Sequence, residues 1–366
     1  MTAIGLMSGT SLDGVDVAII VSDGLKLINI GPAESFPYEP AFRGVLKECL
    51  GKTLTEPGVI EVSKTLTDIH VWAVQELLKK NNLQAEDIDL IGFHGHTILH
   101  QPNQGLTVQI GDPDRLAKKL GVTVIGNFRS RDVAEGGEGA PLVPIFHHAL
   151  CSELDKPIAL LNIGGVANVS WIGEGGSAEE PNIIAFDTGP GNALIDDWVN
   201  CSIGVSMDKD GKLANAGKVH NEIVDHLLGN SFFKRSPPKS LDRDDFRDAI
   251  QIISQLSVED GAATLSEFSA SCVKKAQDDF PEAAECWLIT GGGRHNKTLM
   301  SMLKKNLSGE VKPIEAVGFD GDTLEAQAFA FLAIRSIYGL PLTLPRTTGV
   351  SMPLAGGTFH MAGNFY

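Results

Sequence analysis

The feature that most constrains this chain is a pattern that occurs twice: an apolar strand, a turn of small residues and a second apolar strand. It reads IGLMSGTSLDGVDVAII at residues 4–20 and IALLNIGGVANVSWI at residues 158–172. Each copy is followed by segments with helical periodicity, so each begins an α/β lobe. With 366 residues, the chain also exceeds the length at which one hydrophobic core usually stops growing. We therefore expect two duplicated α/β lobes on mixed sheets with a cleft between them, the first formed by residues 1–140 plus about 340–366 and the second by 141–339.

Apolar runs and helical spacing predict the elements of these lobes. We expect strands at residues 3–7, 15–21, 25–30, 88–93, 107–110, 122–125, 157–162 and 166–171. Helices are expected at residues 41–50, 59–80, 297–305 and 323–338. Another helix should begin after the N-cap pair Asp112–Pro113 and end near Gly121, because both are typical helix-boundary residues.

Charge and cysteine content restrict the partners and the compartment. The formal net charge of −16 disfavours binding to nucleic acids or anionic membranes, because such binding needs a basic surface. A small phosphorylated ligand is still compatible, since backbone N–H groups bind phosphate without net positive charge. The five cysteines contain no Cys-x-x-Cys pair, and the first residues lack the basic segment of an export signal. We expect a cytoplasmic protein with reduced thiols.

The first glycine-rich turn contains the groups that a triphosphate needs. Residues 9–16 combine unobstructed backbone N–H groups with hydroxyls and with carboxylates that can hold a metal ion or its water shell. The candidate ligand-binding residues of this turn are Gly9, Thr10, Ser11, Leu12, Asp13, Gly14, Val15 and Asp16. A plain β-hairpin turn, in which glycine and aspartate are common, is the open alternative.

Two further glycine turns follow apolar strands. Gly164 and Gly165, with Asn168 nearby, could grip phosphates from the other side, and residues 291–293 could receive a flat group or a phosphate before a helix. Close packing of strand and helix is the alternative for the second of these turns. Three such turns at corresponding strand ends are together a stronger signal than any one alone. The chain has neither a P-loop nor a Gly-x-Gly-x-x-Gly motif, which excludes the familiar Walker and Rossmann sites.

Asp187 is the candidate catalytic residue. It ends the apolar run at residues 183–186 and precedes Thr-Gly-Pro-Gly-Asn and a helix. A carboxylate in such a position can take a proton from water or from a sugar hydroxyl. Helix N-capping is the alternative role.

The remaining polar candidates are less specific. His94, His96 and His100 lack the spacing of a zinc site and are interpreted as residues that bind a polar ligand or are buried for structural reasons. Arg129 could bind a carboxylate or phosphate, although a surface salt bridge is the default interpretation. Glu325 lies on an otherwise apolar helix face and is similarly ambiguous.

Taken together, these motifs resemble the anhydro-N-acetylmuramic acid kinase family, a branch of the actin, hexokinase and heat-shock ATPase superfamily. The segments that carry the resemblance are GLMSGTSLDGVD at 5–16, GFHGHTILHQP at 92–102, QIGDP at 109–113, FRSRDVAEGGEGAPLVP at 128–144, NIGGVANVS at 162–170, FDTGPGN at 186–192 and TGGGRHN at 290–296. The resemblance extends nearly from end to end of the chain. It implies the two-lobed actin-like or hexokinase-like fold with duplicated mixed-sheet domains and an interdomain cleft.

The resemblance also implies an activity. ATP, with Mg²⁺, would phosphorylate the amino sugar while water opens its 1,6-anhydro ring, giving N-acetylmuramic acid 6-phosphate in cell-wall recycling. Asp187 would be the general base, and Thr97, Arg129 and Glu325 would contact the sugar. The residues assigned to ATP are Gly9, Thr10, Ser11, Leu12, Asp13, Gly14, Val15, Asp16, Gly164, Gly165, Asn168, Gly291, Gly292, Gly293 and Asn296. The metal ligands are not identified, and a homodimer is an open alternative to a monomer.

Two other functions stay open at this stage. A kinase for another amino sugar or carboxylate would keep the three glycine turns but change the pocket around Thr97, Arg129 and Glu325. A nucleotide-driven clamp or filament protein like actin would use ATP to control lobe closure and would phosphorylate no sugar. Such a clamp does not account for Asp187 in its loop.

Overall fold

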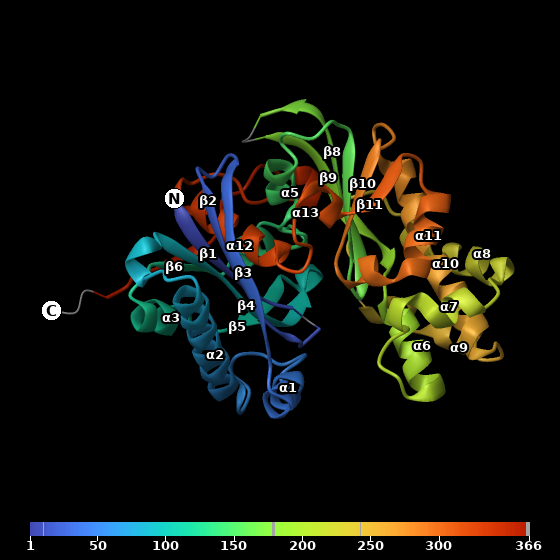
Figure 1. Ribbon diagram of the computed structural model, residues 1–366, viewed down its shortest axis with the longest axis horizontal. Coiled ribbons are helices and arrows are strands. Elements are labelled where there is room, and N and C mark those ends of the chain that lie inside the picture. Colours follow the sequence, from blue (N-terminus) through green and yellow to red (C-terminus); the bar gives the residue numbers. More distant parts are fainter. Residues whose placement is uncertain (10, 178–179, 242, 364–366) are drawn as a thin grey trace. The chain divides into compact units, whose positions relative to one another are not determined.

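The computed structural model describes residues 1–9, 11–177, 180–241 and 243–363. The chain divides into two compact units (Figure 1). The first unit consists of Met1–Glu153, Gly176–Pro181 and Asp322–Tyr366, and the second of Leu154–Gly175 and Asn182–Gly321. Residues 141–153 and 322–339, which we assigned to the second lobe from the sequence, thus belong to the first unit. The reason is that helix α12 (Leu324–Ile337) packs on strands β1, β2 and β4 of the first unit and also contacts α5 (Pro144–Leu150).

The first unit is built on a mixed sheet. Its strands are β1 (Thr2–Ser8), β2 (Gly14–Ser22), β3 (Leu27–Pro37), β4 (Leu90–Gln101), β5 (Leu106–Ile110), β6 (Val124–Gly126) and β12 (Thr358–His360). They are arranged in the order β12-β6-β4-β1-β2-β3, and β5 pairs with β4. Strands β1, β2 and β3 form an antiparallel meander, while β4 runs parallel to β1 and β6 runs parallel to β4.

The second unit repeats this arrangement. Its strands are β7 (Ile158–Ile163), β8 (Val166–Gly176), β9 (Pro181–Pro190), β10 (Cys286–Thr290) and β11 (Glu310–Pro313), in the order β11-β10-β7-β8-β9. Strands β7 and β8 are antiparallel, and β10 is parallel to both β7 and β11. In both units the first strand therefore lies between its own hairpin partner and a later parallel strand. This confirms the expected fold with a mixed sheet duplicated in two α/β units.

Helices cover both faces of the first sheet. Helices α2 (Val59–Lys80) and α3 (Pro113–Leu120) bury their apolar residues with Ile4, Leu6 and Phe93 in one core (Figure 1). Helix α12 approaches the opposite face at two glycines: a Cβ on Gly5 would lie 1.7 Å from the Ala326 carbonyl oxygen, and one on Gly92 would lie 2.1 Å from that of Phe329. Only glycine permits a helix backbone to come so close to a strand. The remaining helices of this unit are α1 (Pro40–Lys47), α4 (Ser130–Ala134), α5 and α13 (Pro345–Thr348).

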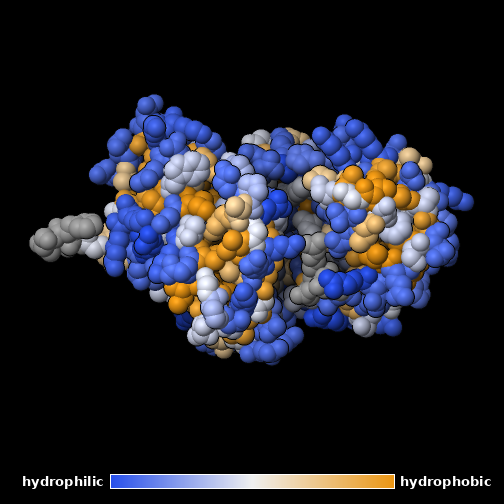
Figure 2. All heavy atoms as spheres, turned by 90° about the horizontal axis from the view of Figure 1, so that it is seen from below, coloured by the Kyte–Doolittle hydropathy of each residue, from blue (hydrophilic) through white to orange (hydrophobic). Residues whose placement is uncertain are grey.

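The second unit has two adjoining apolar clusters. Helices α10 (Val258–Ala276) and α11 (Lys297–Asn306) pack against β7, β8, β9 and β10 in the first cluster. The other cluster joins α10 to α6 (Ala193–Ile203), α7 (Lys212–Ala216), α8 (Asn221–Leu228) and α9 (Asp248–Ile252). The face drawn in Figure 2 is a mosaic of hydrophilic and hydrophobic residues. Within the described part of the chain, none of the helices combines the length and the apolar character needed to cross a membrane.

Candidate active site

The first glycine turn joins β1 to β2 and contains two glycines of different kinds. A Cβ on Gly14 would lie 2.3 Å from the Phe36 carbonyl oxygen, so strand packing alone requires glycine there. A Cβ on Gly9 would meet only the Ser11 hydroxyl, at 3.6 Å, which leaves the backbone of Gly9 open to a ligand. Leu12 adopts φ 61°, a left-handed conformation that is uncommon and costly for a bulky residue. Strained backbone of this kind clusters at functional sites. Thr10 lies outside the described residues.

The other candidates in this turn have separate environments. The side chains of Leu12 and Val15 are buried in the core of the first unit, so any contact that these two residues make with a nucleotide is limited to their backbone. Asp13 is exposed and forms an ion pair with Arg43 at 3.3 Å. Asp16 is half-buried, and its Oδ1 accepts a hydrogen bond from the Ser35 hydroxyl at 2.5 Å.

The glycine segments of the second unit meet at the carboxyl end of β7. The Gly164 carbonyl accepts a hydrogen bond from the Asn192 N–H (2.8 Å), and the Gly165 carbonyl accepts one from the Gly191 N–H (2.9 Å). On the other side, a Cβ on Gly291 would lie 2.7 Å from the Ile163 carbonyl oxygen. The carboxyl ends of parallel strands are the usual ligand-binding edge of an open α/β sheet. The segments at 164–165, 186–192 and 290–296 therefore form one local cluster.

Packing explains only some of these glycines. Gly291 and Gly293 press against the end of β7, since a Cβ on Gly293 would lie 2.4 Å from Ile163 Cγ2. A Cβ on Gly292, in contrast, would have nothing within 4 Å. Added Cβ atoms on Gly164 and Gly165 would make only ordinary contacts, at 3.5 and 3.6 Å. Gly291 and Gly293 thus anchor the turns by packing. Gly164, Gly165 and Gly292 present open backbone.

The two asparagines assigned to ATP have different positions. Asn168 is half-buried on β8 and faces Asn162 of β7 across the ladder. It lies on the strand face opposite to Ala167 and Val169, which are part of the core. Asn296 is buried, and its side-chain oxygen accepts a hydrogen bond from the Leu299 N–H at 3.0 Å. Asn296 is therefore the N-cap of α11, and this role already uses its side-chain oxygen.

Asp187 lies near the end of β9 and is half-buried. Its neighbour Phe186 belongs to the core, so Asp187 points from the opposite face of the strand. The Leu241 N–H donates a hydrogen bond to its Oδ2 (2.8 Å), and the backbone N–H of Asp187 donates to the Lys239 carbonyl (3.0 Å). The N-cap of α6 is Asn192, so the helix-capping role considered for Asp187 is wrong. The segment that supports this carboxylate, residues 239–241, was not identified from the sequence, because it has no motif of its own.

Arg129 of the first unit is fixed by a histidine that sequence reasoning did not pair with it. The guanidinium donates through Nε and Nη2 to His94 Nε2 (3.1 and 3.0 Å) and through Nη1 to the Gly139 carbonyl (2.7 Å). His94 Nδ1 contacts the Gly95 carbonyl at 3.0 Å, which requires its proton to be on Nδ1. Burial and the nearby Arg129 charge hold the pKa of His94 well below its ordinary value. A neutral histidine thus orients a half-buried cation.

Glu325 and Arg129 influence each other electrostatically. Burial lowers the pKa of Arg129 to about 10, an effect that the charges of Glu325 and Asp132 oppose. Burial also raises the pKa of Glu325, opposed by Arg129 and reinforced by Asp16. Glu325 belongs to the first turn of α12. Three residues singled out from the sequence, Asp16, Arg129 and Glu325, are therefore electrostatically coupled within the first unit.

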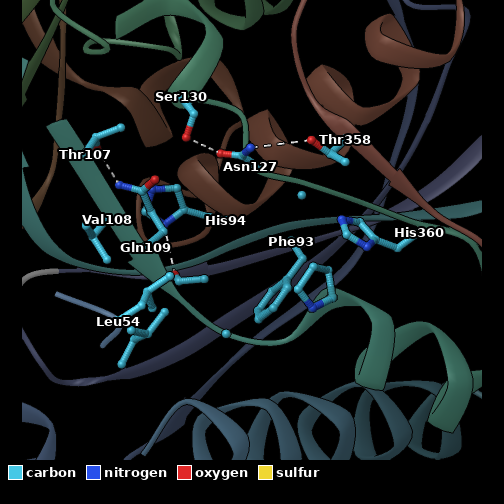
Figure 3. A pocket seen from close by; sticks show the side chains of 15 residues that line it. Leu54, Phe93, His94, Thr107, Val108, Gln109, Asn127, Ser130, Thr358 and His360 are labelled. Atoms are coloured by element: carbon cyan, nitrogen blue, oxygen red, sulfur yellow. Dashed lines mark hydrogen bonds between the residues drawn. The ribbon is translucent and has the colours of Figure 1, made fainter. Parts of the chain in front are cut away.

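Thr97 belongs to a neighbouring polar network. Its hydroxyl accepts a hydrogen bond from Gln109 Nε2 (3.3 Å), which also donates to Thr107 (2.8 Å). Gln109 and His94 face a cavity of about 330 Å³ in the first unit (Figure 3). Thr97, Arg129 and Glu325 do not line this cavity, but Thr97 and Arg129 contact residues that do. Other lining residues are Phe93, Asn127, Ser130 and Thr358.

His94 and His96 do not share one side of the strand. Gly95 adopts φ 72°, and the β1–β4 register shifts so that Ser8 lies opposite His96. His96 Nδ1 is 2.9 Å from the Ser8 hydroxyl, which in turn is 2.6 Å from the Tyr38 hydroxyl. A glycine with positive φ thus interrupts the pleat that would otherwise place these two side chains on the same face. Among the described residues, no three His, Cys, Asp or Glu side chains are grouped so that they could hold a metal ion.

The family model and the curated relatives carry the same description. The family model described as anhydro-N-acetylmuramic acid kinase matches residues 1–362. An anhydro-N-acetylmuramic acid kinase from Paramagnetospirillum magneticum is 49% identical over 99% of this chain and 100% of its own length. One from Rhodospirillum rubrum is 48% identical over 98% of this chain and 93% of its own. Among solved structures, component A of (R)-2-hydroxyglutaryl-CoA dehydratase from Acidaminococcus fermentans has a TM-score of 0.46 and 13% identity, over 91% of this chain and 99% of that one. The chain belongs to the anhydro-N-acetylmuramic acid kinase family.

Proposed function

We propose that this sugar kinase uses ATP to phosphorylate O6 of 1,6-anhydro-N-acetylmuramic acid while water opens the anhydro ring. The product is N-acetylmuramic acid 6-phosphate, formed in the cytoplasm during recycling of the cell wall. The observation that carries the proposal is the cluster at the carboxyl end of β7. There, open glycine backbone at residues 164, 165 and 292 adjoins the segment that leads from Asp187 to Asn192.

The glycine turns supply the groups that bind the nucleotide. In the first unit, Gly9 presents open backbone for a phosphate. In the second unit, Gly165 offers its backbone N–H group, whereas the Gly164 N–H already donates to the Val166 carbonyl (3.2 Å). The turn at residues 291–293 receives the adenosine, because Gly292 leaves open space above its backbone. The family resemblance assigns the same turns to ATP, so the two lines of argument support each other.

The residues present fit a magnesium ion that is held mainly by phosphate oxygens. Mg²⁺ binds proteins through one or two carboxylates and keeps several waters, so it does not need a cluster of three protein ligands. Asp16 is the candidate ligand, because its carboxylate is half-buried next to the first glycine turn, whereas Asp13 is exposed and paired with Arg43. When bound, the ion would neutralise charge that develops on the phosphates.

Arg129, Thr97 and Glu325 of the first unit bind the sugar. Arg129 is held by His94 and Gly139, which leaves further N–H groups of its guanidinium for a carboxylate such as the one on the lactyl group of the substrate. Thr97 and Glu325 supply a hydroxyl and a carboxylate for sugar hydroxyl and amide groups. Because Arg129 is already oriented, it loses little conformational entropy when the ligand binds.

The proposed reaction uses Asp187 as the general base and ATP as the phosphoryl donor. Asp187 accepts a proton from water as the water oxygen bonds to the anomeric carbon. The bond between that carbon and O6 breaks, and O6 attacks the γ-phosphorus as ADP leaves. The hydrogen bond from the Leu241 N–H to Oδ2 (2.8 Å) holds the Asp187 carboxylate in a fixed orientation for this proton transfer.

A direct assay tests this function. The purified protein is incubated with Mg-ATP and the anhydro sugar in ¹⁸O-labelled water, and the product is analysed at once by mass spectrometry. We expect one ¹⁸O at the anomeric carbon and none in the phosphate, and a kcat about 10² to 10⁴ lower for Asp187→Asn. Unlabelled N-acetylmuramic acid 6-phosphate in the same water controls for exchange.

Other substrates distinguish the rival functions. Preferential phosphorylation of N-acetylglucosamine or of open-ring N-acetylmuramic acid would identify a kinase for another amino sugar. ATP hydrolysis without any phosphosugar would identify a nucleotide-driven clamp. Either result would contradict the proposal.

A further inference from the structure

Lys239 is a buried cation without a place in the function described so far. Its side chain is 4% exposed. The ammonium donates to the Arg235 carbonyl (2.9 Å) and to Asp279 Oδ2 (3.1 Å). It also lies 5.3 Å from the ring centre of Phe186 and 5.4 Å from that of Phe232. Two aromatic faces, a carbonyl and a carboxylate thus replace the water shell of this ammonium.

These contacts immobilise the backbone on which Asp187 depends. The bond to Arg235 closes the segment 235–239 on itself, and the bond to Asp279 ties it to the 3₁₀ turn Gln277–Asp279 after α10. The carbonyl of Lys239 accepts the Asp187 N–H, and the N–H of Leu241, two residues later, donates to the Asp187 carboxylate. Phe186, which the ammonium contacts, is the residue next to Asp187 in the chain.

Stability alone does not explain a charge at this position. Replacing a buried ion pair by an apolar side chain of similar volume is often neutral or stabilising, because burial of the charges costs hydration free energy. Directional bonds, in contrast, fix a backbone segment in one place. A shift of about 1 Å in a reacting group can lower a rate by about a hundredfold.

We propose that Lys239 is a positioning residue that holds the segment 235–241 so that the Leu241 N–H aims the Asp187 carboxylate. This inference rests on the proposed function in one respect, because it assumes that Asp187 is the base. It adds a residue that neither the motifs nor the glycine turns assign.

The decisive variant is Lys239→Met, which keeps an unbranched side chain of similar volume and removes its charge and its donors. We expect kcat to fall about tenfold to a hundredfold, with the KM values for ATP and sugar within about twofold of wild type, because Lys239 contacts neither ligand. Lys239→Arg should recover part of the lost kcat, since it restores a cation between the two rings. Lys274→Met, an exposed lysine on α10, is the matched control and should behave as wild type.

Hydrogen exchange gives a readout that does not depend on activity. In the full chain, Lys239→Met should accelerate exchange of the amides in residues 235–241 relative to wild type and Lys274→Met. If Lys239→Met does not fold, Asp279→Ala removes the same anchor from its other side and should give the same changes.

The possible results separate the two proposals. A kcat for Lys239→Met within about twofold of wild type, or unchanged exchange at 235–241, overturns the role of Lys239. An absence of sugar phosphorylation by the wild-type protein overturns the proposed function instead, and the exchange measurement then decides the positioning role by itself. Reduced kcat with faster local exchange and recovery by arginine supports the inference.

Discussion

Buried histidines of the first unit show how folding fixes the charge of single residues. His70 on α2 donates through Nδ1 to the Leu66 carbonyl at 2.7 Å, and its ring packs edge-on against Phe93. His96 is bonded through Nδ1 to Ser8. Burial lowers the pKa of each imidazole to about 4 from 6.5. Both rings are therefore neutral in the folded protein at neutral pH.

This charge state predicts acid sensitivity of the first unit. Between pH 6.5 and about 4 the unfolded chain binds protons at these histidines and the folded chain does not, so the free energy of unfolding should decrease as the pH falls through this window. We expect His70→Leu to reduce this decrease relative to wild type. Urea unfolding at several pH values measures it, with exposed His226→Leu as the control. Parallel pH profiles for His70→Leu and wild type would refute the explanation.

At the scale of elements, the glycine turns of the second unit separate packing from ligand binding. Gly293 is needed because Ile163 occupies the space that a Cβ would fill, whereas Gly292 is adjacent to open space. The sequence shows no other difference between Gly292 and Gly293. They therefore form a matched pair for experiment.

We predict opposite effects for alanine at these two positions. Gly293→Ala should lower stability by about 1–3 kcal/mol through overpacking against Ile163. Gly292→Ala should leave the melting temperature close to that of wild type but raise the KM for ATP, since its methyl group would occupy the space assigned to the nucleotide. Thermal unfolding and ATP titration measure the two effects. Equal ATP affinity for Gly292→Ala and wild type would exclude this turn from the nucleotide site.

Elements with strong periodicity and end signals could be predicted from the sequence. Helix α2 matches its expected limits, and α3 has Asp112 as its N-cap and Gly121 as its C-cap, as expected. Strand β4 was expected to end at residue 93 but continues to Gln101, because pairing with β5 extends it through polar residues that hydrophobicity does not reveal. The short strand β12 is defined only by its partner β6, far away in the sequence. Long-range pairing of this kind leaves no local pattern.

The candidate site could be predicted where residues form motifs. The convergence of the 164–165, 186–192 and 290–296 segments followed from their positions at strand ends. The partners that orient the functional groups could not be predicted in this way. His94 is bonded to Arg129 next to Gly95, where a positive φ interrupts the strand. Lys239 reaches the neighbourhood of Asp187 through a loop without regular structure. Tertiary contacts decide such roles.

At the scale of the whole molecule, each unit has its own apolar core. Leu66 is fully buried in the core of the first unit, and Leu303 in that of the second. A protein with separate cores need not unfold in a single transition. A destabilising substitution in one unit should therefore affect mainly the stability of that unit.

We predict that truncations in the two cores act on different sets of amides. Leu66→Ala should cost about 2–5 kcal/mol and accelerate hydrogen exchange in β1 and β4, with little change in β7 and β10. Leu303→Ala should have the reverse pattern. Acceleration of exchange in all four strands by either variant would instead indicate one cooperative unit.

The position of α12 in the chain has a consequence for biosynthesis. The helix that covers the glycine face of the first sheet is encoded after the entire second unit. A nascent chain on the ribosome can therefore complete the later sheet while the earlier one still lacks half of its cover. Domains generally fold as units during synthesis, and here the portion translated first is the last to finish.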